Sequence, residues 1–240
     1  MTTTASQPKL PAKRGVAPIW LILFTILFIM AAAIISFVVF QPILVLPRIT
    51  LAPGFALTDQ NGSQISNEDL RGQIVLYNFT YTNCEECAQT DEVMAQVQNR
   101  LDEVATEDIP IKLVTISVDP EHDTPDVLTE YAQSLGANPD QWVFATGSPA
   151  MLKSVIGGGF SLFYQQREDG AFDLDPGFML IDGNGIMRAE YRTAVPEIDI
   201  MLRDIGLLVE EAQNSNGAAK IGYEAAHLFL CYPPRYLCNA

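Results

Sequence analysis

The sequence predicts an α/β domain, a central mixed sheet with helices on both faces, behind a single N-terminal transmembrane helix. Segments with the period of a strand alternate along the chain with segments of helical period, which is typical of a sheet covered by helices. An uncharged apolar stretch that is long enough to cross a bilayer precedes them. No internal repeat interrupts the roughly 190 residues that follow, so they suit a single domain.

The apolar stretch runs from Pro18 to Phe40 and is predicted to be an uncleaved membrane anchor. Residues 1–17 carry three basic side chains and no acidic one, which places the N-terminus in the cytoplasm and the remainder outside. A cleaved signal peptide is the alternative, with Ala31–Ala33 as the cleavage region. The chain stays apolar from Ile34 through Leu46, and this favours the anchor.

The exported part is strongly acidic. All 29 Asp and Glu follow residue 50, together with 10 of the 14 Lys and Arg, which argues against a nucleic-acid partner. All four cysteines also lie there, in a compartment where disulfides persist. The short N-terminal extension has no Arg-rich amphipathic segment, so we expect a bacterial cytoplasmic membrane and not a mitochondrial one.

The domain is expected over residues 53–213, between a spacer, 41–52, and a Cys-containing tail, 214–240. Pro125 after Thr124 is typical of a helix start, and Gly183–Gly185 of a hairpin turn. The predicted elements, in order, are strand 74–80, helix 85–105, strand 111–118, helix 124–135, strand 142–146, helix 149–156, strands 178–182 and 186–191, and helix 196–213.

Two cysteines, Cys84 and Cys87, stand where the first of these strands meets its helix. The positive end of a helix dipole stabilises a thiolate, which attacks disulfides and binds soft metals. Asn83 followed by Glu86 predicts a capping box at this helix start. An inert disulfide and half of a zinc site are the alternatives. The strand–cysteine–helix context favours a reactive pair.

Two further motifs carry a resemblance to known families. Residues 55–62 and 70–72 resemble the opening of thioredoxin-fold redoxins. Phe79–Cys84 and Ile116–Pro125 are similar to motifs of the Sco/SenC family of membrane-anchored copper-assembly proteins. The resemblance covers about residues 50–210. It implies a thioredoxin-like fold, and a role in delivering copper to a cytochrome c oxidase copper centre or in reducing its cysteines.

The chain departs from the family pattern in two places. The family's cysteines are separated by three residues, whereas Cys84 and Cys87 are separated by two. The family also supplies a distal histidine as third copper ligand, and its place falls near Leu174. Pro176, six residues before Asp182, instead resembles the cis proline that packs beside the dithiol in membrane-anchored thioredoxin-like reductases. An ordinary loop proline is the alternative.

These departures favour thiol–disulfide exchange over copper carriage. Cys84 is expected to be the exposed nucleophile and Cys87 the resolving cysteine, with Pro176 beside them. The partner would be a cytochrome c oxidase subunit or another extracytoplasmic thiol protein. Glu85 and Glu86 place negative charge beside the sulfurs, which disfavours the thiolate and predicts a reducing couple.

Three other functions are considered. Cu(I) is soft enough to bind through Cys84 and Cys87 alone, and His122 is a candidate further ligand. A peroxidase of the peroxiredoxin type would need a Ser or Thr before a single reactive cysteine, which Thr80 or Thr82 could supply, and an activating Arg. The second cysteine argues against it. An assembly scaffold without turnover would tolerate loss of Cys84.

The tail has its own candidates. Cys231 and Cys238 would close a short Pro-containing loop as a disulfide. His227 lies four residues before Cys231 and so on the same helix face, and with both cysteines it would form a metal site. Alternatively, the two cysteines would be a second dithiol that relays electrons to Cys84 and Cys87. Apolar Leu228–Leu230 beside them suggest docking on the domain or the membrane.

Overall fold

The structure is a computed structural model and describes residues 18–40, 43–104 and 108–229. The chain divides into two compact units, residues 1–42 and 43–240. The first unit contains helix α1 (Pro18–Phe40), which has no charged residue. Its segment Ile19–Ser36 is long and apolar enough to cross a membrane. The helix therefore suits a single-pass anchor.

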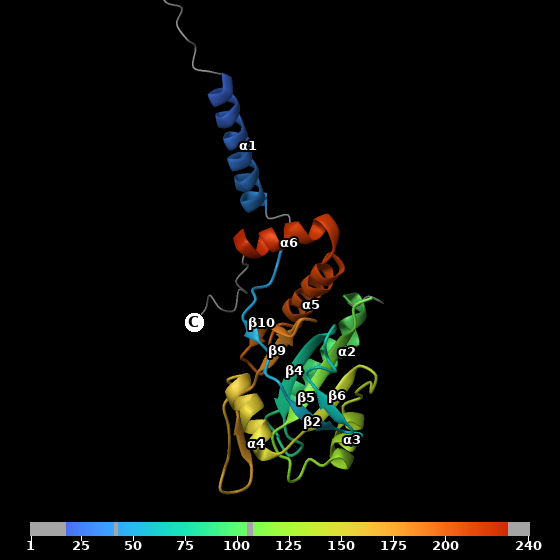
Figure 1. The fold of residues 1–240 in the computed structure, drawn as a ribbon. Helices are drawn as coiled ribbons and strands as arrows, with labels where there is room; N and C mark the ends of the chain where they lie inside the picture. The colour runs from blue at the N-terminus through green and yellow to red at the C-terminus, as the bar shows by residue number, and fades with distance from the viewer. Residues whose placement is uncertain (1–17, 41–42, 105–107, 230–240) are drawn as a thin grey trace, which may run out of the picture. The chain divides into compact units, whose positions relative to one another are not determined.

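The second unit is built on a mixed eight-stranded sheet (Figure 1). Its three central strands, β4, β5 and β6, are parallel, and the remaining neighbours pair antiparallel. The strands lie in the order β1 (Thr50–Leu51), β10 (Ile186–Tyr191), β9 (Phe178–Ile181), β4 (Ile74–Thr80), β5 (Ile111–Ser117), β6 (Trp142–Thr146), β2 (Ala56–Asp59) and β3 (Gln64–Ser66). A separate hairpin joins β7 (Tyr164–Gln166) to β8 (Phe172–Leu174).

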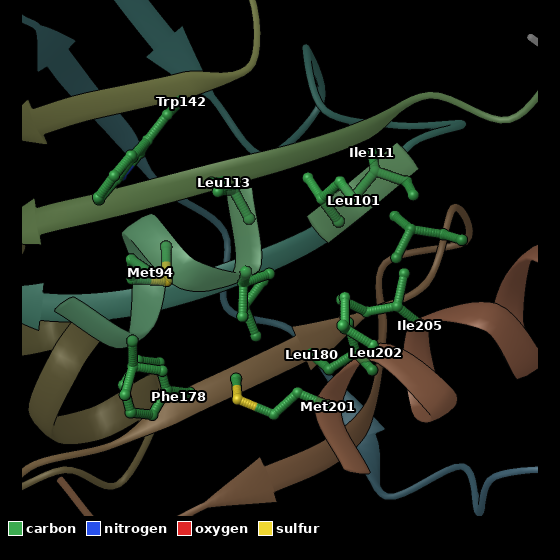
Figure 2. Close-up of a cluster of buried hydrophobic side chains, with 14 of the residues drawn as sticks. Met94, Leu101, Ile111, Leu113, Trp142, Phe178, Leu180, Met201, Leu202 and Ile205 are labelled. Carbon is green, nitrogen blue, oxygen red and sulfur yellow. The ribbon is translucent and has the colours of Figure 1, made fainter. Parts of the chain in front are cut away.

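Helices cover both faces of this sheet. Helices α2 (Ala88–Arg100), α3 (Pro125–Ser134) and α5 (Ile198–Gln213) contribute side chains to one buried cluster. The parallel crossovers through α2 and α3 share one hand, which places both helices on this face. Figure 2 shows Met94 of α2 and Met201, Leu202 and Ile205 of α5 in this cluster. Helix α4 (Pro149–Leu152) and the π-helical turn after it, Lys153–Gly159, contribute to the other. The predicted fold class is confirmed.

Strand β4 shows why the sheet is central. Ile74 and Leu76 point into the cluster under α2 and α5, while Val75, Tyr77 and Phe79 point into the opposite cluster. Every residue of the strand is buried, which is typical of a parallel strand covered on both faces. Burial on both faces holds the end of β4, where the cysteines follow, in a fixed position.

Several short elements go beyond the predicted set. The hairpin β2–β3, the hairpin β7–β8 and helix α6 (Gly217–Phe229) were not among the predicted elements. The helix predicted over 85–105 is shorter, because it begins at Ala88 and passes after Arg100 into a 3₁₀ turn, Leu101–Glu103. The short helix predicted over 149–156 is α-helical only to Leu152 and then widens into the π-helical turn.

Residues that flank the predicted domain also pack against it. Val45 and Leu46 are fully buried. Arg48 pairs with Glu224 of α6 at 3.0 Å. Ala226 of the same helix is fully buried, so α6 docks on the unit.

Candidate dithiol site

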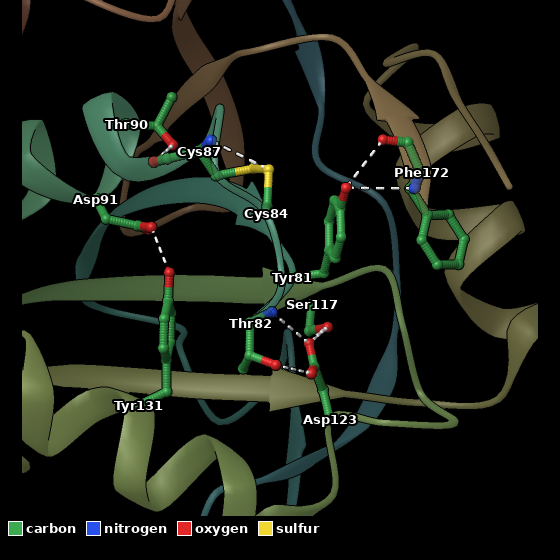
Figure 3. Close-up of a disulfide and its surroundings, with 10 residues drawn as sticks. All are labelled: Tyr81, Thr82, Cys84, Cys87, Thr90, Asp91, Ser117, Asp123, Tyr131 and Phe172. Atoms are coloured by element: carbon green, nitrogen blue, oxygen red, sulfur yellow. Dashed lines mark hydrogen bonds between the residues drawn. A yellow bond between two sulfur atoms is a disulfide. The ribbon is translucent and has the colours of Figure 1, made fainter. Parts of the chain in front are cut away.

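The two cysteines of the predicted site lie in the turn between β4 and α2 and are joined by a disulfide (Figure 3). Their Cα atoms are 5.2 Å apart. Cys84 is half-buried, whereas Cys87 is 7% exposed and belongs to the apolar cluster behind it. The Cys87 N–H donates to Cys84 Sγ at 3.1 Å. Cys84 is thus the accessible sulfur, and its thiolate would receive a backbone hydrogen bond.

The predicted capping box is wrong. Helix α2 begins at Ala88 with Cys87 at the N-cap position, and no side chain caps it. Asn83 lies instead in an exposed turn whose Cys84 N–H donates to Tyr81 O. The turn has to bring Cys84 back over Cys87, so the helix starts one turn later than the capping pattern suggests.

A buried carboxylate anchors the cysteine turn. Asp123 is fully buried and accepts hydrogen bonds from Thr82 N at 3.0 Å and Thr82 Oγ1 at 2.5 Å. It also accepts from Ser117 Oγ (Figure 3). The two motifs of the sequence resemblance thus meet in space, because Asp123 belongs to the second and Thr82 to the first.

A tyrosine connects the same turn to the hairpin β7–β8. Tyr81 Oη donates to Phe172 O at 3.2 Å and accepts from Phe172 N at 3.3 Å. The two rings also stack edge to face with centroids 5.4 Å apart. The hairpin is therefore held beside the disulfide, although 80 residues or more separate it from Cys84 in the sequence. Sequence reasoning missed this contact, because nothing local to Tyr81 identifies its partner.

A pocket of about 190 Å³ opens beside the disulfide. Leu174, near which the family's histidine is expected, and Pro176 both line it with the two cysteines. The described residues contain no cis peptide bond, so Pro176 is trans. It therefore lacks the cis form that the resemblance to the reductases implies. The remaining lining residues are Phe79, Glu86, Gln89, Thr90, Phe172 and Ala194.

A buried acid that the sequence analysis missed lies behind the cysteines. Asp91 is 1% exposed, its N–H donates to Cys87 O at 3.0 Å, and its carboxylate accepts from Tyr131 Oη at 2.5 Å. Burial raises the pKa of Asp91 to about 6, against the opposing effect of the hydrogen bond from Tyr131 and of the nearby polar side chains of Asn78 and Thr80. An acidic residue four positions after Cys87 on one helix face was the available signal.

The other predicted ligands do not join the pair in the described structure. His122 is exposed and contacts Asp119, with Nδ1 2.8 Å from Oδ2. His227 contacts Glu211, with Nε2 2.9 Å from Oε1. Cys231 and Cys238, and the side chains of Leu228–Leu230, lie outside the described residues. Residues 18–40, 43–104 and 108–229 contain no cluster of three or more His, Cys, Asp or Glu suited to a metal.

The donor set beside β4 is therefore two sulfurs and an apolar neighbour. Two thiolates match the soft Cu(I) ion, and Leu174 offers it no third donor. A zinc site needs four ligands and finds two here. The arrangement can exchange disulfides through Cys84, and it can offer Cu(I) a two-coordinate site.

Fold and site together define a thioredoxin-like dithiol protein with an apolar N-terminal helix. A family model described as SCO1/SenC matches residues 47–210, so the chain belongs to the Sco/SenC family.

Individual relatives agree with this assignment. The chain is 35% identical to the "SCO1 protein homolog" of Bacillus subtilis over 94 residues, which is 39% of this chain and 47% of that relative. BsSco, described as "a member of the Sco family of cytochrome c oxidase assembly proteins" with a disulfide switch, superposes with a TM-score of 0.61 at 26% identity. The match covers 70% of this chain and 98% of BsSco. ScoI of Bradyrhizobium japonicum, solved with copper bound, gives 0.55 at 25%, covering 66% and 99%.

Proposed function

We propose that this protein is an extracytoplasmic, membrane-anchored thiol–disulfide oxidoreductase that acts in the assembly of the copper centre of cytochrome c oxidase. The observation that carries the proposal is the unequal pair of cysteines: Cys84 is accessible and receives an N–H, and Cys87 is buried beneath it. BsSco, a relative with a disulfide switch and a part in oxidase assembly, supports it.

The exchange reaction follows from this geometry. In the reduced protein the Cys84 thiolate attacks a partner disulfide, a bond from Cys84 Sγ to one partner sulfur forms, and the other partner sulfur leaves as a thiolate. Cys87 then loses its proton to solvent and attacks Cys84 Sγ. The partner sulfur that was bonded to Cys84 leaves as a thiolate. The partner disulfide is thereby reduced by two electrons, and the Cys84–Cys87 dithiol is oxidised to a disulfide.

Trapping tests the proposal. The full chain with Cys87→Ser is expected to accumulate a mixed disulfide with the oxidised copper-binding subunit of the oxidase, because the resolving sulfur is missing. The Cys84→Ser variant, which keeps the buried sulfur, serves as the matched control and should trap at least about tenfold less. Equal trapping by both variants, or none by either, would refute the exchange role.

Cu(I) carriage is the second candidate, with copper as cargo. Two sulfurs in one turn and the copper-bound ScoI of Bradyrhizobium japonicum favour it. If Leu174 occupies the third-ligand position, Leu174→His should tighten Cu(I) binding to the reduced full chain about tenfold or more in a chelator competition. Val195→His, on the neighbouring loop, is the control. If the wild-type protein already binds Cu(I) tightly and Cys84→Ser/Cys87→Ser abolishes the binding, the two cysteines are sufficient for Cu(I) carriage and no third ligand at position 174 is needed.

A further inference from the structure

The pocket beside the disulfide has one apolar wall. Phe172, Leu174, Pro176 and Ala194 form it, and the more polar side carries Glu86, Gln89 and Thr90. Leu174, near which the family's histidine is expected, instead forms part of an apolar surface next to the accessible Cys84 sulfur. An apolar side chain that enters this pocket leaves water, and the binding free energy becomes more favourable in proportion to the apolar area that is buried.

Glu86 lines this pocket, and Glu85 and Asp175 directly adjoin lining residues in the sequence. Glu85, Glu86 and Asp175 are exposed, and in the described part of the chain none of them forms an ion pair. Asp173, two residues before Asp175, differs because Arg167 lies 3.3 Å from it. Three unpaired negative charges, in the pocket lining or next to it in the sequence, attract a positively charged ligand, most strongly at low ionic strength.

The apolar surface continues past Ala194. The next loop residues, Val195 and Pro196, line a second hollow of about 420 Å³ together with Ile200. Val195 is 62% exposed. A small thiol compound can occupy one hollow, whereas an extended polypeptide can cover both. The occupant best matched to the two hollows is therefore a polypeptide segment.

We propose that the dithiol acts on a polypeptide segment whose reactive cysteine has an apolar neighbour, seated against Leu174, and a Lys or Arg neighbour that faces Glu85, Glu86 and Asp175. The inference rests on the proposed exchange function and names its substrate class. The first step is the attack of Cys84 described above, so the partner cysteine must come within bonding distance of Cys84 Sγ. Its flanking side chains then contact the apolar wall and the acidic rim.

Peptide kinetics test the proposal with the reduced full chain in nonionic detergent. Each peptide carries one cysteine as a disulfide with 5-thio-2-nitrobenzoate, whose release reports the rate. The core sequences are Leu-Cys-Lys, Leu-Cys-Glu and Gly-Cys-Lys. We expect Leu-Cys-Lys to react about tenfold faster than Leu-Cys-Glu at low salt, and the ratio to approach one near about 0.5 M NaCl. Gly-Cys-Lys should react about fivefold more slowly than Leu-Cys-Lys.

Matched variants separate the rim from the overall negative charge. Glu85→Gln/Glu86→Gln/Asp175→Asn should remove the Lys-over-Glu preference. Asp102→Asn/Asp108→Asn/Asp140→Asn should keep it, because it changes the net charge equally at exposed sites near the amino ends of the parallel strands. The readout is the ratio of rate constants for two peptides, so a change in the reactivity of Cys84 itself cancels.

The apolar wall has its own pair. Leu174→Ser should abolish the preference for Leu-Cys-Lys over Gly-Cys-Lys, whereas Leu51→Ser, at an exposed strand residue, should not. Reaction with every peptide at one rate would overturn the substrate inference and leave the exchange function standing. Loss of the Lys preference in both charge variants would also overturn it. Absence of reaction with any peptide would instead count against the exchange function.

Discussion

At the scale of single residues, the site combines an accessible sulfur with buried polar groups directly behind it. Cys84 faces the pocket, and Asp91 and Tyr131 lie on the protein side of the pair. Asn78 Nδ2, Thr80 Oγ1 and Asp91 Oδ1 are buried without a hydrogen-bond partner in the described structure. An unpartnered buried polar atom costs about 1–3 kcal/mol, so this cluster lowers the stability of the fold near its functional end.

Asp91 gives a prediction about stability and pH. Its pKa is raised from 3.8 to about 6, so the folded state disfavours the carboxylate and stability falls as the pH rises through this window. Asp91→Asn should therefore raise the free energy of unfolding by about 2 kcal/mol at pH 8. The gain should vanish below the unfolded pKa of 3.8. Urea denaturation across this pH range measures both quantities.

An exposed acid supplies the comparison for that measurement. Asp108→Asn removes the same charge from an exposed position and should change the free energy of unfolding by less than about 0.5 kcal/mol. A loss of stability at pH 8 in Asp91→Asn would mean that the folded protein prefers the ionised carboxylate, which contradicts the burial argument.

Residue identity and spacing were sufficient to predict the cysteine pair and its position between a strand and a helix. They were not sufficient for the contacts that support the pair. Tyr81 binds Phe172, and Asp123 holds Thr82, across 41 residues or more. Such partners are set by how the strands assemble, and the periodicity of a single sequence does not encode that assembly.

At the scale of elements, strand β4 and the hairpin β7–β8 illustrate two kinds of predictability. The β-branched and aromatic residues of β4 define it unambiguously, because they are buried on both faces. The strands β7 and β8 have three residues each, and their alternation is too short to distinguish from a loop. Sequence reasoning therefore found the central elements, while the hairpin that carries Phe172 and Leu174 was missed.

Helix α6 is attached to the domain through a buried group of charges. Arg188 is 1% exposed and donates to Asp182 at 2.8 Å, to Glu211 at 2.7 Å and to Pro47 O at 3.1 Å. Glu211 also contacts His227 of α6 at 2.9 Å. Arg48, in the segment before β1, lies 3.8 Å from the same carboxylate. Strand β10, α6 and this segment therefore meet at one carboxylate of α5.

Glu211 provides the prediction at this scale. Burial alone would raise the pKa of Glu211, but hydrogen bonds from His227 and Arg188 outweigh it and lower the pKa from 4.5 to about 2. A depressed pKa stabilises the folded state above the unfolded value, and this stability is lost as the pH falls from 4.5 toward about 2. Glu211→Gln should cost about 3 kcal/mol at pH 7, because it leaves Arg188 with one carboxylate fewer.

A surface ion pair is the control for this variant. Glu68 pairs with Arg71 at 3.5 Å and its side chain is 70% exposed, so Glu68→Gln should cost less than about 0.5 kcal/mol. The difference between wild type and Glu211→Gln in thermal or chemical unfolding should shrink steadily below pH 4.5. A cost at pH 7 no larger than that of Glu68→Gln would show that the cluster does not hold α6 in place.

At the scale of the whole molecule, charge and hydropathy are divided along the chain. The 23 residues of α1 carry no charge, and all the acidic residues follow residue 50. The three basic side chains before α1 favour retention of the N-terminus in the cytoplasm. Composition alone was enough to predict the apolar helix α1, because such a helix depends on summed hydrophobicity and not on tertiary contacts.

The topology can be measured with single cysteines in a variant with Cys84→Ser, Cys87→Ser, Cys231→Ser and Cys238→Ser. Ser6→Cys reports on the N-terminal segment, and Glu130→Cys reports an exposed position on α3. A membrane-impermeant maleimide should label Glu130→Cys in intact spheroplasts and Ser6→Cys only after detergent lysis, because a bilayer of about 30 Å hydrocarbon separates them. The reverse pattern would place the dithiol in the cytoplasm, where it could not reach an extracytoplasmic copper centre. A chain that has lost residue 6 altogether would establish the cleaved signal peptide in place of the anchor.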